Sequence, residues 1–462
     1  MAGLLGAVAV PYERPGLGVV LTCLAIMAAA LPAIRPRLAG PWPLAFTAVS
    51  ALLLATCTLL DAPWVIAPCV ALSALLASIA IADVTAGWAA LTRGASAVLR
   101  ALYPAAFFLA RPLRGPARRI RLPAVLTGLG LTVAVLLVFV PLLASADAAF
   151  SRLIDGLWET DRLPELIGRG IVLLTIALIT GAVALAGLRP HKEPGPEHHA
   201  RTLDRTVWIP PLAALCLLFC AFIAVQAQAL FGGERRILNT AGVTYAGAAR
   251  EGFFQLIFVA TLVLGVVALA SWRVPREPRG DRVLLGWMLG LLHVLTLVLL
   301  ASAAHRLYLY TEAFGLTRPR ATAAGVAWWL AIVFVLLLVA GPARRRGWLP
   351  RAVAMVTGLA LLSFAAVNPD ARIADSQVIP GNRLTGADTI ELGTLSADAV
   401  PALERLPEPT RSCVLGIVAD ELRDDDGWGG WNLSRERARS RLSDAGVTPT
   451  DVPYLSACPT PR

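Results

Sequence analysis

The sequence predicts an all-α fold: a polytopic bundle of about ten transmembrane helices, followed by a small, mostly helical soluble tail. The chain is 57% hydrophobic and only 16% charged, with a mean hydropathy of +0.67. Apolar runs of roughly 20 residues, the length that crosses about 30 Å of hydrocarbon as a helix, follow one another through residue 367. After residue 367 charged residues become frequent, which marks the end of the membrane part.

The apolar runs are expected to be helices. They are continuously apolar, whereas a membrane barrel needs strands in which polar and apolar residues alternate. The second and third runs are separated only around Asp61 and Pro63, which indicates a tight helical hairpin. The expected spans are Gly16–Ile34, Trp42–Leu60, Ala62–Ala82, Pro123–Leu143, Gly170–Gly187, Val207–Leu230, Gly252–Trp272, Val283–Ala304, Ala321–Ala340 and Leu349–Val367.

Arginine is concentrated in alternate loops, beginning with Arg35 and Arg37 after the first span. The positive-inside rule predicts that these loops face the cytoplasm and that both termini lie outside. Lys192 is the only lysine among 41 basic residues, a bias typical of a high-GC bacterial genome. The net charge of +10 is therefore a topology signal. The same loops could bind anionic lipid headgroups, and no nucleic-acid partner is expected.

One connection on the arginine-rich side has two interpretations. The stretch Trp88–Leu109 is apolar with spaced arginines and is broken by Pro104. It could lie in the membrane interface as an amphipathic helix. It could equally extend the third span, with its arginines reaching the headgroups.

The composition divides the chain into a transmembrane domain over residues 1–367 and an extracytoplasmic tail over residues 368–462. We expect tail helices over residues 396–406, 411–422 and 434–445, the first of them capped by Ser396. The third carries Arg435, Arg437, Arg439 and Arg441, which are expected on its polar sides.

Two cysteines lie in the tail, at Cys413 and Cys458. An oxidising compartment could join them in a disulfide. Their spacing alone does not show that they meet, so both states stay open. Protein partners of the tail are not indicated by its sequence.

The densest polar cluster at a membrane border lies between residues 302 and 320. On a helix, His305, Tyr308 and Glu312 share one face, while Arg306 and Tyr310 share an adjoining face. These five residues are the candidates for a catalytic site: a His–Glu pair could relay a proton, and Arg306 could hold a phosphate or carboxylate. The alternative is that the helix ends here and its side chains lie among the headgroups.

Other polar residues fall near membrane depth. His293 could bond to another helix or carry a proton, and Gln226 and Gln255 could bridge helices or line a cavity. Asp147 follows the fourth span and could pair with an arginine on the same side. No cofactor or metal ion is expected, because the chain has no nucleophile elbow, phosphate-binding loop, zinc-protease helix or dinucleotide fingerprint.

Seven segments resemble those of a bacterial multi-spanning inner-membrane family described as domain of unknown function 4173, with kinship to family 4153. The resemblance covers roughly residues 123–445, with a family-like membrane core over residues 123–367. It implies the architecture and no reaction, and it suggests a shared constellation of Arg250, Glu251, Arg306, Tyr310, Glu312 and Arg318. The segments are SADAAF at Ser145–Phe150, VQAQALFGG at Val225–Gly233, YAGAAREGFFQL at Tyr245–Leu256, RLYLYTEAFGLTRPR at Arg306–Arg320, NPDARIA at Asn368–Ala374, LSADAVPAL at Leu395–Leu403 and WNLSRERA at Trp431–Ala438.

Three functions remain open from the sequence. The first is a transporter of a small or anionic solute, with a polar line through Gln226, Gln255, His293 and His305. The second is a membrane enzyme acting on lipid or envelope precursors, in which the arginines hold phosphate and a glutamate acts as base. The third is a scaffold or sensor whose external tail contacts a partner.

Overall fold

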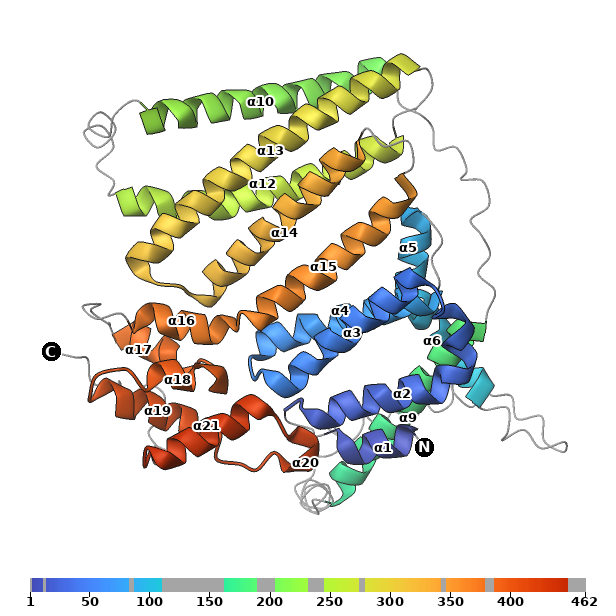
Figure 1. The fold of residues 1–462 in the computed structure, drawn as a ribbon, viewed down its shortest axis with the longest axis vertical. Coiled ribbons are helices and arrows are strands. Elements are labelled where there is room, and N and C mark those ends of the chain that lie inside the picture. The colour runs from blue at the N-terminus through green and yellow to red at the C-terminus, as the bar shows by residue number, and fades with distance from the viewer. Residues whose placement is uncertain are drawn as a thin grey trace, which may run out of the picture.

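A computed structural model describes residues 2–10, 14–82, 87–109, 162–188, 204–231, 245–273, 279–341, 346–378 and 386–447 (Figure 1). These residues form helices and turns and contain no β-strand, so the all-α prediction is confirmed. Nine helices in this part of the chain are long and apolar enough to cross a membrane, and they match nine of the expected spans. The remaining expected span, residues 123–143, and Asp147 lie outside the described residues.

The membrane segments are helical because lipid offers the backbone no other hydrogen-bond partners, and they are long because they must cross about 30 Å of hydrocarbon. In chain order they are α2 (Leu17–Ile34), α3 (Pro41–Leu59), α4 (Pro63–Ala82), α9 (Arg162–Leu188), α10 (Arg205–Phe231), α12 (Tyr245–Arg273), α13 (Arg279–Phe314), α14 (Arg318–Ala340) and α15 (Leu349–Ala366). The short helix α1 (Ala2–Ala9) precedes them.

The membrane helices pack around three apolar cores. Helices α10, α12, α13 and α14 share the first, with Leu330 and Phe334 fully buried. Helices α3, α4 and α15 share the second, around Leu53 and Cys69. Helices α1, α2, α6 and α9 share the third. Because α14 packs on α15, the first two groups form one continuous row in Figure 1.

The connection after α4 forms two helices, α5 (Trp88–Ala95) and α6 (Ala97–Leu109). The expected break at Pro104 is wrong, since Pro104 lies inside α6 and the chain bends at Ser96 instead. Helix α6 packs along α9, so it belongs to the bundle rather than extending α4.

The C-terminal helices form a separate group with its own apolar core, which contains Leu392, Val400, Leu403 and Val414. The expected helices of the tail are confirmed, as α18, α19 and α21. Cys413 is disulfide-bonded, and Cys458 lies outside the described residues. The elements are α16 (Pro369–Gln377), α17 (Gly386–Gly393), η3 (Ala397–Ala399), α18 (Val400–Leu403), α19 (Thr410–Glu421), α20 (Gly427–Gly430) and α21 (Leu433–Asp444).

The C-terminal helices gather at one end of the membrane bundle, as Figure 1 shows. The end of α3, the beginning of α4 and the end of α15 lie there. The helix ends that carry arginines from the arginine-rich loops, such as Arg35, Arg282 and Arg351, lie at the opposite end of their helices. The C-terminal helices and the arginine-rich ends therefore occupy opposite ends of the bundle.

Candidate functional site

The five catalytic candidates lie near the C-terminal end of α13. His305, Tyr308 and Glu312 are exposed on one face, Tyr308 by 61%. Helix α13 has 36 residues, about 54 Å at 1.5 Å per residue, which exceeds the roughly 30 Å of hydrocarbon. Its last turns therefore extend beyond the hydrocarbon, which favours the interpretation that these side chains lie among headgroups.

The adjoining face of α13 carries Arg306 and Tyr310, both half-buried. Tyr310 is held by α14: the Arg320 Nη2 donates to its hydroxyl oxygen at 3.2 Å, and the guanidinium lies 4.3 Å from the ring centroid. Tyr310 thereby joins two consecutive helices across the turn that contains Gly315. This contact is structural and leaves the face of Glu312 separate.

Three further candidate residues lie on α12, and the structure describes the side chain of one of them. Gln255 is exposed on α12. Arg250 and Glu251 lie in the first turns of α12, but their side chains are outside the described part of the structure. A meeting of these two residues with Arg306 and Glu312 therefore stays a prediction.

Arg318 is the candidate that the structure places in a buried contact. Its Nη2 and Nε donate to Asp370 Oδ2 at 2.8 Å and Oδ1 at 3.1 Å. Asp370 is fully buried at the start of α16, where it also accepts from the Trp64 indole at 3.0 Å and the Ser396 backbone N–H at 3.0 Å. One carboxylate therefore joins α14, α4, α16 and the C-terminal group.

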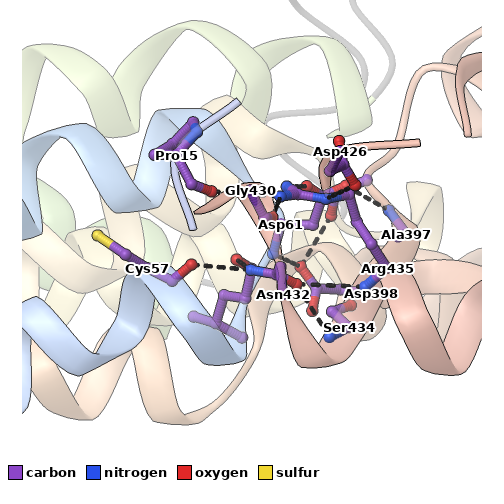
Figure 2. A network of polar contacts seen from close by, with 12 residues as sticks. Pro15, Cys57, Asp61, Ala397, Asp398, Asp426, Gly430, Asn432, Ser434 and Arg435 are labelled. Carbon is purple, nitrogen blue, oxygen red and sulfur yellow. Dashed lines mark hydrogen bonds and ion pairs between the residues drawn. The ribbon is translucent and has the colours of Figure 1, made fainter. Parts of the chain in front are cut away.

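A second buried ion pair centres on Arg435 in α21 (Figure 2). Its side chain is only 1% exposed, and it contacts Asp61 Oδ1 at 2.6 Å and Asp426 Oδ2 at 2.8 Å. The same guanidinium donates to the backbone carbonyls of Pro15 and Gly430. The expectation that Arg435 lies on a polar, solvated side of its helix is wrong, because the side chain points into the contact with α3 and α4.

Asp398 connects the two ion pairs. Its Oδ2 accepts from the Asp61 backbone N–H at 2.7 Å and from the Ser396 hydroxyl at 3.0 Å. Its Oδ1 accepts from the Asn368 amide at 3.4 Å. Ser396 therefore bonds to Asp398 through its side chain and does not make the capping bond that its sequence position predicts.

Asn432 terminates two helices at once. Its Nδ2 donates to the carbonyls of Cys57 and Leu60 at the end of α3, at 2.9 and 2.7 Å. Its Oδ1 accepts from the backbone N–H groups of Ser434 and Arg435 at the start of α21. Because the last carbonyls and first N–H groups of a helix lack partners within the helix, this amide satisfies both ends.

The backbone of the C-terminal group approaches the N-terminal helices closely next to Arg435. A Cβ on Gly429 would lie 2.2 Å from the Ala9 carbonyl oxygen, and one on Gly16 would lie 2.4 Å from the Gly430 carbonyl oxygen. Side chains would not fit at either position. Glycine at these positions therefore allows α20 to pack on α1 and α2.

Burial and charge shift the pKa values of two carboxylates here in opposite directions. Burial alone would raise the pKa of Asp370, but the hydrogen bonds and charge of Arg318 outweigh it and hold that pKa below its usual value. Burial raises the pKa of Asp398, and the neighbouring Asp61 charge adds to this effect. Among the described residues, Asp370 has a paired cation, Arg318, and Asp398 has none.

These contacts form one network, the polar junction, made of Asp61, Arg318, Asn368, Asp370, Ser396, Asp398, Asp426, Asn432 and Arg435. Most of its charged groups are buried, although Arg318 is 33% exposed, and its donors are used between helices, so the polar junction attaches the C-terminal group to the membrane bundle. Four of the segments that carry the family resemblance supply residues to it: those beginning at Arg306, Asn368, Leu395 and Trp431. The resemblance therefore concentrates on a place where distant segments meet.

One feature of the sequence points to the polar junction. Asp61 is a charged residue in the short turn between two membrane spans, where it needs a partner. Nothing in the local pattern indicated that this partner is Arg435, which is 374 residues away in the chain.

A separate set of polar groups lies inside the bundle of α10, α12, α13 and α14. His293 is 4% exposed and Trp208 is 3% exposed. Among the residues that the structure describes, the buried nitrogens of these two side chains and the Gln226 Nε2 have no hydrogen-bond partner. The Leu289 carbonyl lies near His293 without completing a hydrogen bond.

Two contacts fix how α10 and α13 lie against each other. Arg205 pairs with Asp281 at one end, and the Ser302 hydroxyl donates to Gln226 Oε1 at 2.7 Å near the other end. Gln226 follows Arg205 on α10 by the same number of residues as Ser302 follows Asp281 on α13. Helices α10 and α13 therefore run parallel and in register.

Comparison with known proteins identifies a family and no activity. The family described as domain of unknown function (DUF4153) matches residues 48–406, which include Asp61, Arg318, Asp370 and Asp398 but not Asn432 or Arg435. No curated protein and no solved structure matches the chain. The resemblance to family 4173 is corrected by this match, which is to the related family 4153. The chain belongs to the DUF4153 family.

Proposed function

We propose that this multi-pass membrane protein transports a small solute through the bundle of α10, α12, α13 and α14. The supporting observation is the set of buried, unpaired polar groups on Trp208, His293 and Gln226. In hydrocarbon each unsatisfied polar group costs several kcal/mol. Ionisable side chains at such depth are functional candidates for that reason. A passing solute or water supplies the missing partners.

The depth of the three groups fits this role. Counted from the Arg205–Asp281 pair at 1.5 Å per residue, Trp208 lies about 5 Å along the bundle, His293 about 18 Å and Gln226 about 32 Å. The hydrocarbon is about 30 Å thick. One unpaired group therefore lies near each border and one near the middle.

Two native cysteines of α10 provide the test. Cys216 is buried against α13 and Cys220, one turn later, is exposed on the outside of the bundle; both are free thiols. Only a thiolate reacts quickly, and a thiol in hydrocarbon stays protonated, so alkylation reports water. In variants that retain one of them as the only cysteine of the membrane helices, with Cys23, Cys57 and Cys69 replaced by alanine, iodoacetamide should modify Cys216 and spare Cys220. An inert Cys216 would indicate a dry bundle and contradict transport.

The proposed orientation places the C-terminal helices outside a bacterial inner membrane. It is supported by the arginine-bearing helix ends, which lie opposite the C-terminal group. Those arginines then face the cytoplasmic leaflet, where they can bind anionic headgroups.

A scaffold or sensor is the second candidate, and the polar junction favours it. Arg435, Asp370 and Asn432 are buried in contacts that hold the C-terminal group on the membrane bundle. A Cys216 thiol that does not react with iodoacetamide would favour this alternative. The envelope-enzyme alternative depends on Glu312 and Arg306 acting together, and the exposed position of Glu312 gives it less support.

A further inference from the structure

We infer that the transported solute is small and uncharged, and that His293 is the residue that binds it at the middle of the membrane. This inference rests on the proposed transport function and adds the class of solute and the binding residue. It replaces the expectation of an anionic solute.

The membrane-spanning parts of the four helices have no charge with which to bind an ion. Within residues 206–226, 253–271, 283–304 and 321–340, which form the membrane-spanning parts of α10, α12, α13 and α14, the sequence contains no Asp, Glu, Lys or Arg. His293 is the only histidine in these segments, and Cys216 and Cys220 are their only other side chains that titrate near neutral pH. An ion in such surroundings would remain unpaired at high cost, whereas an uncharged polar molecule would not.

The unpaired groups define what the solute must offer. A neutral imidazole has one donor and one acceptor, and the Trp208 indole and Gln226 amide nitrogens are donors. Thr296, fully buried one turn after His293, donates its hydroxyl to the Leu292 carbonyl at 2.7 Å and keeps its acceptor lone pairs. The site therefore suits a molecule that mainly accepts hydrogen bonds and can also donate them, as hydroxyl and amide compounds do.

Apolar neighbours limit the size of this molecule. The Phe334 ring lies 5.7 Å from the His293 ring at an interplanar angle of 63°. Leu292 and Leu330 are fully buried in the same core. We therefore expect solutes of the size of water, urea or glycerol.

The experiment uses the full-length protein in proteoliposomes. Shrinkage and swelling are followed by light scattering with water, urea and glycerol as uncharged probes and formate as the charged probe. The wild-type vesicles should pass at least one uncharged probe faster than protein-free vesicles and should not pass formate. His293→Leu should reduce the added permeability by about fivefold, the factor that one lost hydrogen bond of ordinary strength produces.

Two further variants serve as controls. Trp287→Leu changes an α13 side chain that is 77% exposed on the outside of the bundle, and it should transport normally. His293→Gln keeps a donor and an acceptor and should retain most of the permeability, which separates binding from folding.

The outcomes are distinguishable. Passage of formate but of no uncharged probe would overturn the inference and leave transport standing. Equal permeability of His293→Leu and wild type would exclude His293 as the binding residue. If no probe passes, the inference fails, and an inert Cys216 would then show that the transport proposal fails with it.

Discussion

Arg435 and Asp61 lie 374 residues apart in the chain, and their side chains form a 2.6 Å ion pair. The contact joins α21, the last described helix, to the turn between α3 and α4. With Arg435 1% exposed and Asp61 11% exposed, the pair is shielded from water. It couples the C-terminal group directly to the membrane bundle.

The first prediction concerns this pair. Arg435→Ala leaves Asp61 buried without its cation and leaves Asp426 paired with Arg439 alone. Removing one partner of a buried pair typically costs about 3–5 kcal/mol. We expect a clear drop in the melting temperature of the purified protein and faster release of the C-terminal group by protease. The matched control is Arg437→Ala, because Arg437 lies on the same helix and is exposed. Equal protease resistance in both variants would contradict the role given to Arg435.

The second prediction separates the two roles of Asn432. Asn432→Asp keeps an oxygen that accepts from the first N–H groups of α21, and aspartate is a good N-cap residue. It removes the donors to the Cys57 and Leu60 carbonyls and brings a negative charge against them. We therefore expect normal helix content by circular dichroism with weaker docking, measured by protease release. Docking as firm as in the wild type would show that the contact with α3 contributes little.

The third prediction concerns pH. The raised pKa of Asp398 means that the folded state resists ionisation of this carboxyl, so its contribution to stability increases as pH falls through the folded pKa toward the unfolded value of about 3.9. Asp370 has the opposite sign: its contribution is present above about 3.9 and is lost only as pH falls through its lowered folded pKa. Melting temperatures from pH 8 to pH 4.5 should therefore show a gain on acidification that Asp398→Asn removes. An unchanged slope in this variant would exclude Asp398 as the source.

The fourth prediction concerns the close approach of α20 to α1. In Gly429→Ala the new Cβ would lie 2.2 Å from the Ala9 carbonyl oxygen, so the backbones must move apart. Overpacking of this kind usually costs about 1–3 kcal/mol. Gly170→Ala is the matched control, because a Cβ there meets no atom within 4 Å. The melting temperature should fall for Gly429→Ala alone, and equal values for both variants would argue against close packing of α20.

The membrane helices could be predicted closely because lipid imposes a strong and local rule. Each span must be apolar over about 20 residues, and this property is visible in the sequence without its partners. The hairpin around Asp61 was predicted for the same reason. Three helices of the C-terminal group, α18, α19 and α21, could also be predicted from local sequence signals, although Ser396 does not form the capping bond that was expected of it. The break between α5 and α6 at Ser96 has no such signal, and Pro104 is tolerated inside α6.

The polar junction could not be predicted, because its residues are paired across the whole chain. A run of alternating arginines on α21 has the pattern of a solvated face, and only the folded structure shows that Arg435 points inward while Arg437 does not. Similarly, His293 could be identified as unusual from its place in a span. Whether another helix satisfied its ring nitrogens depended on side chains from three other helices.

The last prediction concerns the orientation of the protein in the membrane. The C-terminal helices lie opposite the arginine-bearing helix ends, so the positive-inside rule places them outside the cytoplasm. Alkaline phosphatase fused after Arg462 should be active, because it folds only where disulfides form. A green fluorescent protein fused through the general export route at the same position should stay dark. The matched control fuses each reporter after Arg282, which lies at the start of α13 on the arginine-rich side. At this position alkaline phosphatase should be inactive and green fluorescent protein should be fluorescent. A fluorescent C-terminal fusion would contradict the proposed orientation and would place the polar junction on the cytoplasmic side.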